Sequence, residues 1–287
     1  MIMAVAIYKS LRRVLRDPSG AIGLILVVVI LLISIFAPWL VPYDPNKLDV
    51  LHRFSAPSGL HWLGTDQLGR DLLSRHILGL QIAMVVALSV TGAALILGTT
   101  LGILSAYIQG PIEKLILIAF DSVSSFPSVI LALAAVAVLG SSLPMIIAVI
   151  AISLIPHFGR VARSQVLSVR SEPFIEAEAV LGASQGRILL FHVVPNILAP
   201  LIVIASLDLP IVIATEAGLS FLGLGLRPPL SSLGGLLQDG YQNMSHTVVP
   251  VLVSSSALAI ATLAFTLFGE ALRQATDPRS SKEIQNA

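Results

Sequence analysis

The stretch Ala21-Ile-Gly-Leu-Ile-Leu-Val-Val-Val-Ile-Leu-Leu-Ile-Ser-Ile-Phe-Ala-Pro-Trp-Leu-Val41 carries no charge. About 20 mostly apolar residues in a helix cross the hydrocarbon core of a bilayer, so this stretch predicts a membrane-spanning helix. Basic residues precede it, as they do in a signal peptide. The apolar run is too long for a signal peptide, however, and no small-residue cleavage site follows it. We therefore expect the helix to be retained.

The composition of the whole chain agrees with a lipid environment. Of 287 residues, 55% are hydrophobic and 11% are charged, and the mean hydropathy is +0.92. An average soluble domain carries roughly 25% charged residues, so this chain lacks the polar surface of a cytosolic or secreted enzyme or of a disordered protein. A net charge of +1 offers no basic surface to a nucleic acid. The absence of cysteine excludes disulfides, thiolate metal sites and a cysteine nucleophile.

Five further stretches are long and apolar enough to cross a membrane. Together with the first they predict an all-α, polytopic protein with six transmembrane helices. The fourth of the six, at about 143–158, is the shortest. The five lie at about 80–107, 115–139, 143–158, 197–215 and 247–268.

The basic residues predict the orientation, because cytoplasmic segments of membrane proteins are enriched in lysine and arginine. With the N-terminus inside, the cytoplasmic side holds twelve basic residues, namely Lys9, Arg12, Arg13, Arg16, Lys114, Arg160, Arg163, Arg170, Arg187, Arg273, Arg279 and Lys282. The outer side holds five, namely Lys47, Arg53, Arg70, Arg75 and Arg227. We therefore expect both termini in the cytoplasm.

This topology divides the chain into segments. We expect a cytoplasmic N-terminal segment (1–20), the first span (21–41), an outer loop with an amphipathic helix (42–79), a core of five spans (80–270) and a cytoplasmic tail (271–287). Polar connections of useful size are the outer loop, an inner loop at 159–196 and a second outer loop at 216–246. No internal repeat is evident, so an inverted-repeat transporter receives little support.

The inner loop predicts two short amphipathic helices outside the bilayer. Ser171 is a suitable cap for the first helix, with Pro173 in its first turn. The second helix covers about 187–194 and is expected to end before Pro195, with Gly182 interrupting the run between the two. Such helices suit docking into a groove of a partner protein, and an ordinary cytoplasmic connector is the equally weighted alternative.

The motifs of the inner loop resemble a known family. Glu176-Ala-Glu-Ala-Val-Leu-Gly182, followed by His192-Val-Val-Pro195, is similar to the "EAA loop" of ABC-importer permeases. Glu176, Ala177, Gly182 and Pro195 match that pattern, whereas Glu178 stands where the family usually has alanine. The resemblance implies that this loop, with Glu176, Ala177, Glu178, Gly182, His192 and Pro195, forms a coupling helix seated in a cleft of a cytoplasmic ATPase subunit.

The first outer loop contains two acid–base pairs with a spacing of four. Asp66 with Arg70, and Asp71 with Arg75, are placed to pair on a helix, and Trp62 suits the membrane interface. A purely structural interpretation is an interfacial helix that separates the first two spans. The stretch also resembles the N-terminal signature of the second permease subunit of dipeptide, oligopeptide and nickel importers. Its matching residues include His61, Gly64, Thr65, Asp66, Gly69, Arg70, Asp71, Ser74 and Arg75.

Two more motifs extend this resemblance over nearly the whole chain. Glu216-Ala-Gly-Leu-Ser-Phe-Leu-Gly-Leu-Gly-Leu-Arg-Pro-Pro229 is similar to a segment of the same family, although the family's following tryptophan is absent. The tail Gly269-Glu-Ala-Leu-Arg-Gln-Ala-Thr-Asp-Pro-Arg279 is similar to the family's ending. The second outer loop is apolar for a solvent loop, and irregular backbone within the membrane mouth is tolerated where protein covers it.

Two acidic residues fall within apolar stretches, where a buried charge costs about 2.5–3.5 kcal/mol and therefore marks a candidate functional residue. For Asp121, near the inner end of the third span, we favour a structural role. Asp208 lies in the middle of the fifth span. It has two interpretations: it binds a cationic group of the substrate on the translocation pathway, or it hydrogen-bonds backbone that Pro210 leaves free.

The small residues Ala94, Gly98 and Gly102 stand four apart in the second predicted span and predict close helix packing.

The resemblance implies a multi-pass subunit of a bacterial inner-membrane importer with the type I permease fold. The implied partners are a homologous second permease, two ATPase subunits, an extracytoplasmic binding protein and membrane lipid. We expect no cofactor, metal or catalytic residue in this chain, because ATP and Mg²⁺ would bind to the ATPases and no G-x-x-x-x-G-K-[S/T] motif is present.

Several alternatives remain at this point. Dipeptides or oligopeptides are the first expectation for the substrate, ahead of nickel or metal chelates, glutathione, and opine-like or sugar-like solutes. An ion-coupled secondary transporter or channel would account for Asp208 but not for the inner loop. An intramembrane enzyme is the weakest alternative, since no histidine stands at a metal-ligand spacing with carboxylates and no serine has a nucleophile-elbow context.

Overall fold

A computed structural model describes residues 12–226 and 229–276 of the chain. Within these ranges the protein is helical, and no strand is present beyond an isolated bridge between Thr65 and Asp71. Five described helices are long and apolar enough to cross a membrane, and a bent helix pair brings the number to six if it is counted as one span. The helical, polytopic class is thus confirmed. The basic residues Lys9, Arg227, Arg279 and Lys282, which entered the predicted orientation, lie outside the described residues.

The five unbroken spans are all longer as helices than the apolar stretches that predicted them. They are α2 (Pro18–Leu40), α3 (Leu72–Ile108), α6 (Leu143–Arg170), α9 (Val194–Phe221) and α11 (Val249–Thr276). The expectation that the fourth span is the shortest was wrong. Helix α6 has 28 residues, because its helical periodicity continues past His157 through residues that the inner loop was expected to hold.

The third span is two helices rather than one. Helix α4 (Pro111–Ser124) and helix α5 (Ser128–Leu139) meet at an angle of 85°. Pro127 stands directly before α5, and proline disfavours the helical conformation of the residue before it. The hydroxyl of Ser125 donates to the Asp121 carbonyl oxygen (2.7 Å) and so satisfies one of the groups that the break exposes.

Helices α3 and α6 pack closely at glycines. A Cβ placed on Gly98 would lie 2.7 Å from both the Ile155 carbonyl oxygen and the Phe158 Cβ, and a Cβ on Gly102 would overlap the Gly159 carbonyl oxygen. Ala94 is fully buried beside them. In lipid, helices associate through packing rather than the hydrophobic effect, so small residues at this spacing allow the contact. The stripe therefore packs within this chain, as predicted.

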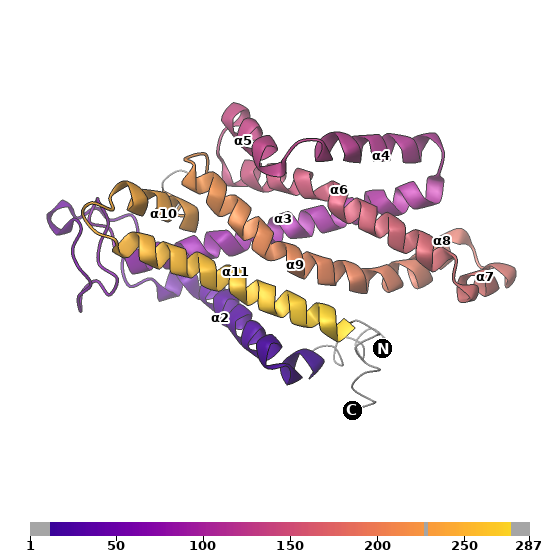
Figure 1. Ribbon diagram of the computed structural model, residues 1–287, viewed down its shortest axis with the longest axis horizontal. Helices are drawn as coiled ribbons and strands as arrows, with labels where there is room; N and C mark the ends of the chain where they lie inside the picture. The colour runs from indigo at the N-terminus through magenta and orange to yellow at the C-terminus, as the bar shows by residue number, and fades with distance from the viewer. Residues whose placement is uncertain (1–11, 227–228, 277–287) are drawn as a thin grey trace.

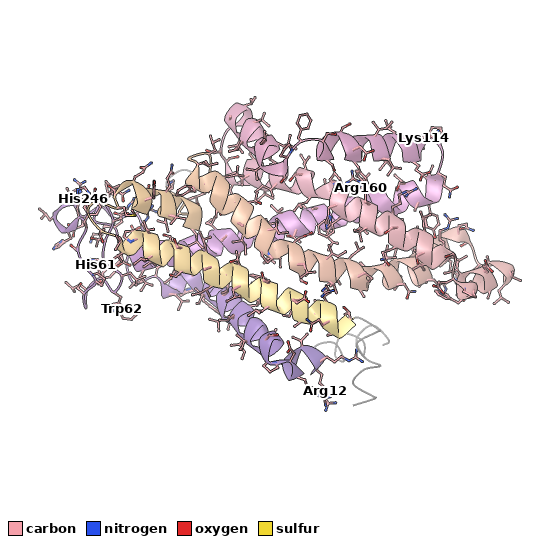
Figure 2. All side chains as sticks on the ribbon, viewed as in Figure 1. Arg12, His61, Trp62, Lys114, Arg160 and His246 are labelled. Carbon is pink, nitrogen blue, oxygen red and sulfur yellow. The ribbon has the colours of Figure 1, made fainter. Side chains whose placement is uncertain are left out.

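The helices form an elongated bundle with distinct ends (Figure 1). One end, here called the α10 end, carries residues 41–71 and the helix α10 (Leu233–Gln242). The other, called the α7 end, carries the short helix α7 (Pro173–Val180). His61, Trp62 and His246 lie at the α10 end and Arg12 at the opposite end of α2 (Figure 2). Arg13 donates to the Ala275 carbonyl oxygen (3.0 Å), so the two described chain ends meet.

The fold thus places the predicted inner and outer segments at opposite ends. Residues predicted to be outside lie at the α10 end, and the inner loop lies at the α7 end (Figures 1 and 2). Which of these ends faces the cytoplasm stays a prediction from the basic residues.

Candidate functional site

The first candidate site is the helix α7 at the α7 end of the bundle. The α7 helix starts at Pro173 with Glu172 as its N-cap; Ser171 instead ends α6, so its expected role as N-cap was wrong. Ile175 is buried against the bundle, whereas Glu176 and Ala177 are exposed. A helix that buries one apolar residue and presents the others outward has a free surface for a partner.

Gly182 ends α7 in a Schellman motif. Its N–H donates to the Ala179 carbonyl oxygen (3.1 Å), and the Ala183 N–H donates to the Glu178 carbonyl oxygen (3.0 Å). The φ angle of Gly182 is +84°, which glycine adopts without steric cost. A Cβ on Gly182 would meet nothing within 4 Å, so the backbone conformation alone requires glycine here.

The second helix of the loop does not end before Pro195, contrary to expectation. Helix α8 (Gln185–Ile188), a π-helical turn η2 (Leu189–Val193) and α9 form one continuous apolar helix to Phe221. Pro195 has no N–H to donate to the preceding turn, and the π turn accommodates this local break in the hydrogen-bond pattern. The end of the inner loop is therefore joined rigidly to a membrane-spanning helix.

The two parts of the loop touch through Glu178 and His192. The His192 Nε2 lies 3.7 Å from the Glu178 Oε1, and both side chains are partly buried. Glu178 is thus turned toward η2, while Glu176 faces outward. The two glutamates of the motif have different environments despite their close spacing.

The α7 end is braced by arginines of α6. The Arg170 Nη1 donates to the Ala106 carbonyl oxygen (2.9 Å), and its guanidinium group lies over the Tyr107 ring, 4.8 Å from the centroid. About two turns earlier on α6, the Arg163 Nε donates to Glu113 (3.1 Å). These contacts hold α3, α4 and α6 together beside the loop, so α7 sits on a fixed base.

The second candidate site is the motif of the first outer loop, which is not a helix. Within residues 41–71 only the short 3₁₀ turn Val50–His52 is helical, and the expected amphipathic helix is absent there. The chain instead folds back on itself through the Thr65–Asp71 bridge, with Gly64 and Gly69 at positive φ angles of +78° and +76°. A Cβ on Gly69 would overlap the Asp49 carbonyl oxygen, so the fold needs a glycine there.

Asp66 is the centre of this motif. Its Oδ2 binds the Arg70 Nε (2.7 Å) and the Arg75 Nη1 (2.6 Å), and its Oδ1 accepts from the backbone N–H groups of Leu68 and Arg70 (2.8 and 3.0 Å). All three charged side chains are buried. The predicted Asp66–Arg70 pair is therefore present, although it forms in a loop. Asp239 of α10 lies 3.6 Å from Arg75 and 3.9 Å from Arg70, which connects the loop to α10.

Asp71 has partners other than the predicted Arg75. Its Oδ1 lies 2.9 Å from the His61 Nδ1, and its Oδ2 accepts from the backbone N–H and the hydroxyl of Ser74 (2.8 and 2.7 Å). Asp71 thereby caps the start of α3. The Thr65 hydroxyl accepts from the Ser55 N–H (2.9 Å). The nine motif residues thus form one connected structure that fastens the loop to α3.

Nearby, the exposed Asp49 and His52 interact at the surface of the same loop. The His52 Nδ1 lies 2.8 Å from the Asp49 Oδ2, and this hydrogen bond lowers the pKa of Asp49 below its ordinary value.

A small polar cavity of about 180 Å³ lies between the start of α3, the end of α9 and α10. Arg75, Asp239, Ser220, Ser231 and Ser232 are among its lining residues. The buried Glu216, at the end of α9, accepts from the Ser220 hydroxyl (2.6 Å). Residues 216–221 of the expected second outer loop are accordingly part of α9.

The third candidate site is Asp208, in the middle of α9. Its side chain is 11% exposed, and the His157 Nε2 of α6 lies 3.4 Å from its Oδ2. Within the described residues this oxygen has no hydrogen-bond partner. His157 lies half-way along α6, at the end of its apolar run.

Asp121 has an ion-pair partner on a neighbouring helix. The Arg160 Nη2 donates to its Oδ1 (2.9 Å) and to the Ser124 hydroxyl (3.1 Å). This contact ties α4 to α6 next to the 85° bend, in agreement with a structural role.

Sequence reasoning did not single out His157 and Asp239. His157 stands at the end of the apolar run 143–158, where a span seemed to stop. Asp239 lies in an amphipathic segment far from the motif in sequence. Only the packing of α6 on α9, and of α10 on the outer loop, brings them to their partners.

Comparison with known families and proteins agrees with these features. Residues 98–282 match the family described as "Binding-protein-dependent transport system inner membrane component". Residues 8–57 match the "N-terminal TM domain of oligopeptide transport permease C".

Individual relatives are similar over most of the chain. The dipeptide transport system permease protein DppC of Alkalihalophilus pseudofirmus is 38% identical over 94% of this chain and 89% of its own length. The probable D,D-dipeptide transport system permease protein DdpC of Escherichia coli is 36% identical (92% and 89%), and the glutathione transport system permease protein GsiD of Pectobacterium atrosepticum is 34% identical (93% and 89%).

A solved structure shares the fold. A chain of the MetNI methionine ABC transporter in an inward-facing conformation superimposes with a TM-score of 0.56 at 19% identity, covering 72% of this chain and 97% of that chain. The family matches, the relatives and the helical bundle agree with one another. The chain belongs to the family of binding-protein-dependent transport system inner membrane components, and it is a multi-pass inner-membrane protein.

Proposed function

We propose that this chain is one of two homologous permease subunits of an ATP-driven importer of dipeptides or oligopeptides. It contributes half of the translocation pathway, and it couples to a cytoplasmic ATPase through α7. A binding protein delivers the substrate from outside, and a pair of ATPase subunits supplies the energy.

The observation that carries this proposal is the position of α7. The helix ends in the Schellman motif of Gly182, presents Glu176 and Ala177 outward, and sits between α6 and the continuous helix that leads into α9. A force applied to α7 therefore reaches two spans directly. An ATPase that binds α7 differently in its ATP-bound and free states would shift the equilibrium between the conformations of the bundle.

The names of the relatives support the choice of substrate. The three relatives described above are named as permeases for a dipeptide, a D,D-dipeptide and glutathione, which is itself a small peptide. A glutathione importer is therefore the second candidate, on the strength of the GsiD similarity. Metal chelates and opine-like solutes are lower-ranked substrates of the same machinery.

The test is reconstitution of the permease with its candidate partners. The chain is co-expressed with a second permease and the ATPases, purified in mild detergent and placed in liposomes with the binding protein. We expect the ATPases to co-purify, and ATP hydrolysis to rise when peptide-loaded binding protein is added. Uptake driven by an ion gradient without any ATPase would instead identify a secondary transporter and overturn the proposal.

A further inference from the structure

The pair His157 and Asp208 occupies the centre of the bundle. Each residue lies at the middle of a 28-residue helix, α6 and α9 respectively. Helix α6 spans about 42 Å, so the pair lies roughly 20 Å from either end of that helix. Asp208 stands inside the apolar run of α9 at 197–215, so its carboxylate lies within the membrane-spanning part of the bundle.

Asp208 has little compensation for its charge from the rest of the chain. Of the helices that pack against α9, α3 has no charged residue after Arg75, α5 has none, and α11 has none before Glu270. On α6 the next charge after His157 is Arg160, which binds Asp121, and Asp239 of α10 faces Arg70 and Arg75. Glu216 lies more than two turns away toward the α10 end and is bound by Ser220. Among the described residues, His157 is the group that faces the Asp208 carboxylate within ion-pair distance.

His157 connects this buried carboxylate to the surface of the chain. Its side chain is 49% exposed, and an exposed polar ring on a membrane-spanning helix is costly where it faces lipid. The same surface continues along α6 to Arg160 and from there to Asp121, which is 73% exposed on α4. Exposed polar groups at this depth face a water-filled path or a partner subunit rather than hydrocarbon.

We propose that the His157–Asp208 pair is a binding site for the ammonium group of a peptide substrate on the translocation pathway. This inference rests on the proposed function. The α-amino group of a peptide is largely protonated at neutral pH. Asp208 supplies the carboxylate, and its Oδ2 has no hydrogen-bond partner in the described chain. An ammonium group beside this oxygen favours the ionised carboxylate. The half-exposed His157 side chain lies beside the carboxylate, at the place where the ammonium group would enter the site from the surface of the chain.

The site has the features of a transient binding site. One carboxylate with one histidine offers fewer ligands than a tight site would have, and a pathway needs binding that is weak enough for release. The alternative role of Asp208, as a partner of backbone freed by Pro210, lacks a supporting hydrogen bond from Asp208 among the described residues. A bound ammonium group would give the Asp208 Oδ2 the hydrogen-bond partner that it lacks, whereas the structural role leaves this oxygen without one.

The test uses the complete transporter in liposomes with its binding protein, and Asp208→Asn as the variant. Uptake of a dipeptide with a free amino group, at a subsaturating concentration, should fall about tenfold or more, because a hydrogen bond to a charged group is worth about 1.5–3 kcal/mol. Assembly and ATP hydrolysis stimulated by loaded binding protein should stay within about twofold of wild type. Asp208→Glu, which keeps the charge, should recover most of the uptake.

Two controls separate binding from structure. Asp121→Asn removes another carboxylate from the same polar surface and should leave uptake within about twofold. Import of an N-acetylated dipeptide should be unaffected by Asp208→Asn, since that peptide lacks the ammonium group. Unchanged uptake in Asp208→Asn, an equal loss for the acetylated peptide, or a parallel loss of assembly without rescue by glutamate would each overturn the inference while leaving the proposed function intact. A wild-type complex that imports no peptide would overturn both.

Discussion

The guanidinium group of Arg75, in the first turn of α3, binds the carboxylate of Asp66 in the outer loop, with Nη1 2.6 Å from Oδ2. Both side chains are buried. This contact fixes where the loop meets the bundle, because Asp66 also binds Arg70 and the backbone of the loop itself. A buried ion pair adds little net stability, but loss of one partner leaves an uncompensated buried charge.

Asp66→Asn should therefore destabilise the protein strongly. The variant leaves Arg70 and Arg75 with Asp239 as their nearest carboxylate, at 3.9 and 3.6 Å. We expect the free energy of unfolding, measured by denaturant titration in mixed micelles, to fall by about 3–5 kcal/mol. Asp239→Asn is the matched control, since Asp239 is partly exposed and more distant, and it should cost less than about 1 kcal/mol. Equal losses in the two variants would contradict the central role of Asp66.

Substitution of Gly98 should separate α3 from α6. A Cβ at this position would lie 2.7 Å from the Ile155 carbonyl oxygen, and backbone cannot move aside as a flexible side chain does. We expect Gly98→Ala to lower the free energy of unfolding by about 1–3 kcal/mol. Gly92→Ala, on the same helix, has nothing within 4 Å of the added Cβ and should be neutral or stabilise by up to about 1 kcal/mol. Equal free energies of unfolding for Gly98→Ala and Gly92→Ala would show that α3 and α6 move apart without loss of stability.

The apolar runs of the sequence were sufficient to predict the spans, because lipid demands about 20 apolar residues in each helix. They did not predict the bend between Ser125 and Pro127, since the apolar character continues through it. Nor did they predict that α6 continues to Arg170. Beyond the bilayer, a helix is held by its contacts, such as Arg170 with Tyr107, and these are invisible in a hydropathy pattern.

The contacts of the candidate site residues were also only partly predictable from the sequence. The spacing of Asp71 and Arg75 indicated a helical pair, but the Asp71 carboxylate caps the start of α3 and contacts His61, and Arg75 binds Asp66 instead. The meeting of His157 with Asp208 depends on how α6 crosses α9, and no local spacing encodes that crossing. Local sequence therefore indicated which charged groups to consider, and tertiary packing decides which of them meet.

Gly182→Pro should uncouple transport from ATP hydrolysis. Proline removes the N–H that donates to Ala179 and fixes φ near −65°, whereas this position needs +84°. We expect loss of the ATP hydrolysis that loaded binding protein stimulates, with normal membrane insertion. Gly140→Pro is the matched control: Gly140 has φ +91° and donates to Val136, but lies between α5 and α6. Normal stimulation in Gly182→Pro, or equal loss in the control, would count against the coupling assignment.

The two glutamates of α7 should differ in their effect on ATPase binding. Glu176 is exposed, so its truncation to alanine removes a charge from the docking surface and should weaken ATPase binding about tenfold. Glu178 faces His192 at 3.7 Å, and a partly exposed pair of this kind is worth at most about 1 kcal/mol. Glu178→Ala should therefore change ATPase binding by less than about threefold. The affinity of detergent-solubilised permease for the ATPase, measured by titration, distinguishes the two. A stronger effect at Glu178 than at Glu176 would mean that the internal contact with His192, rather than the exposed carboxylate, sets the docking surface.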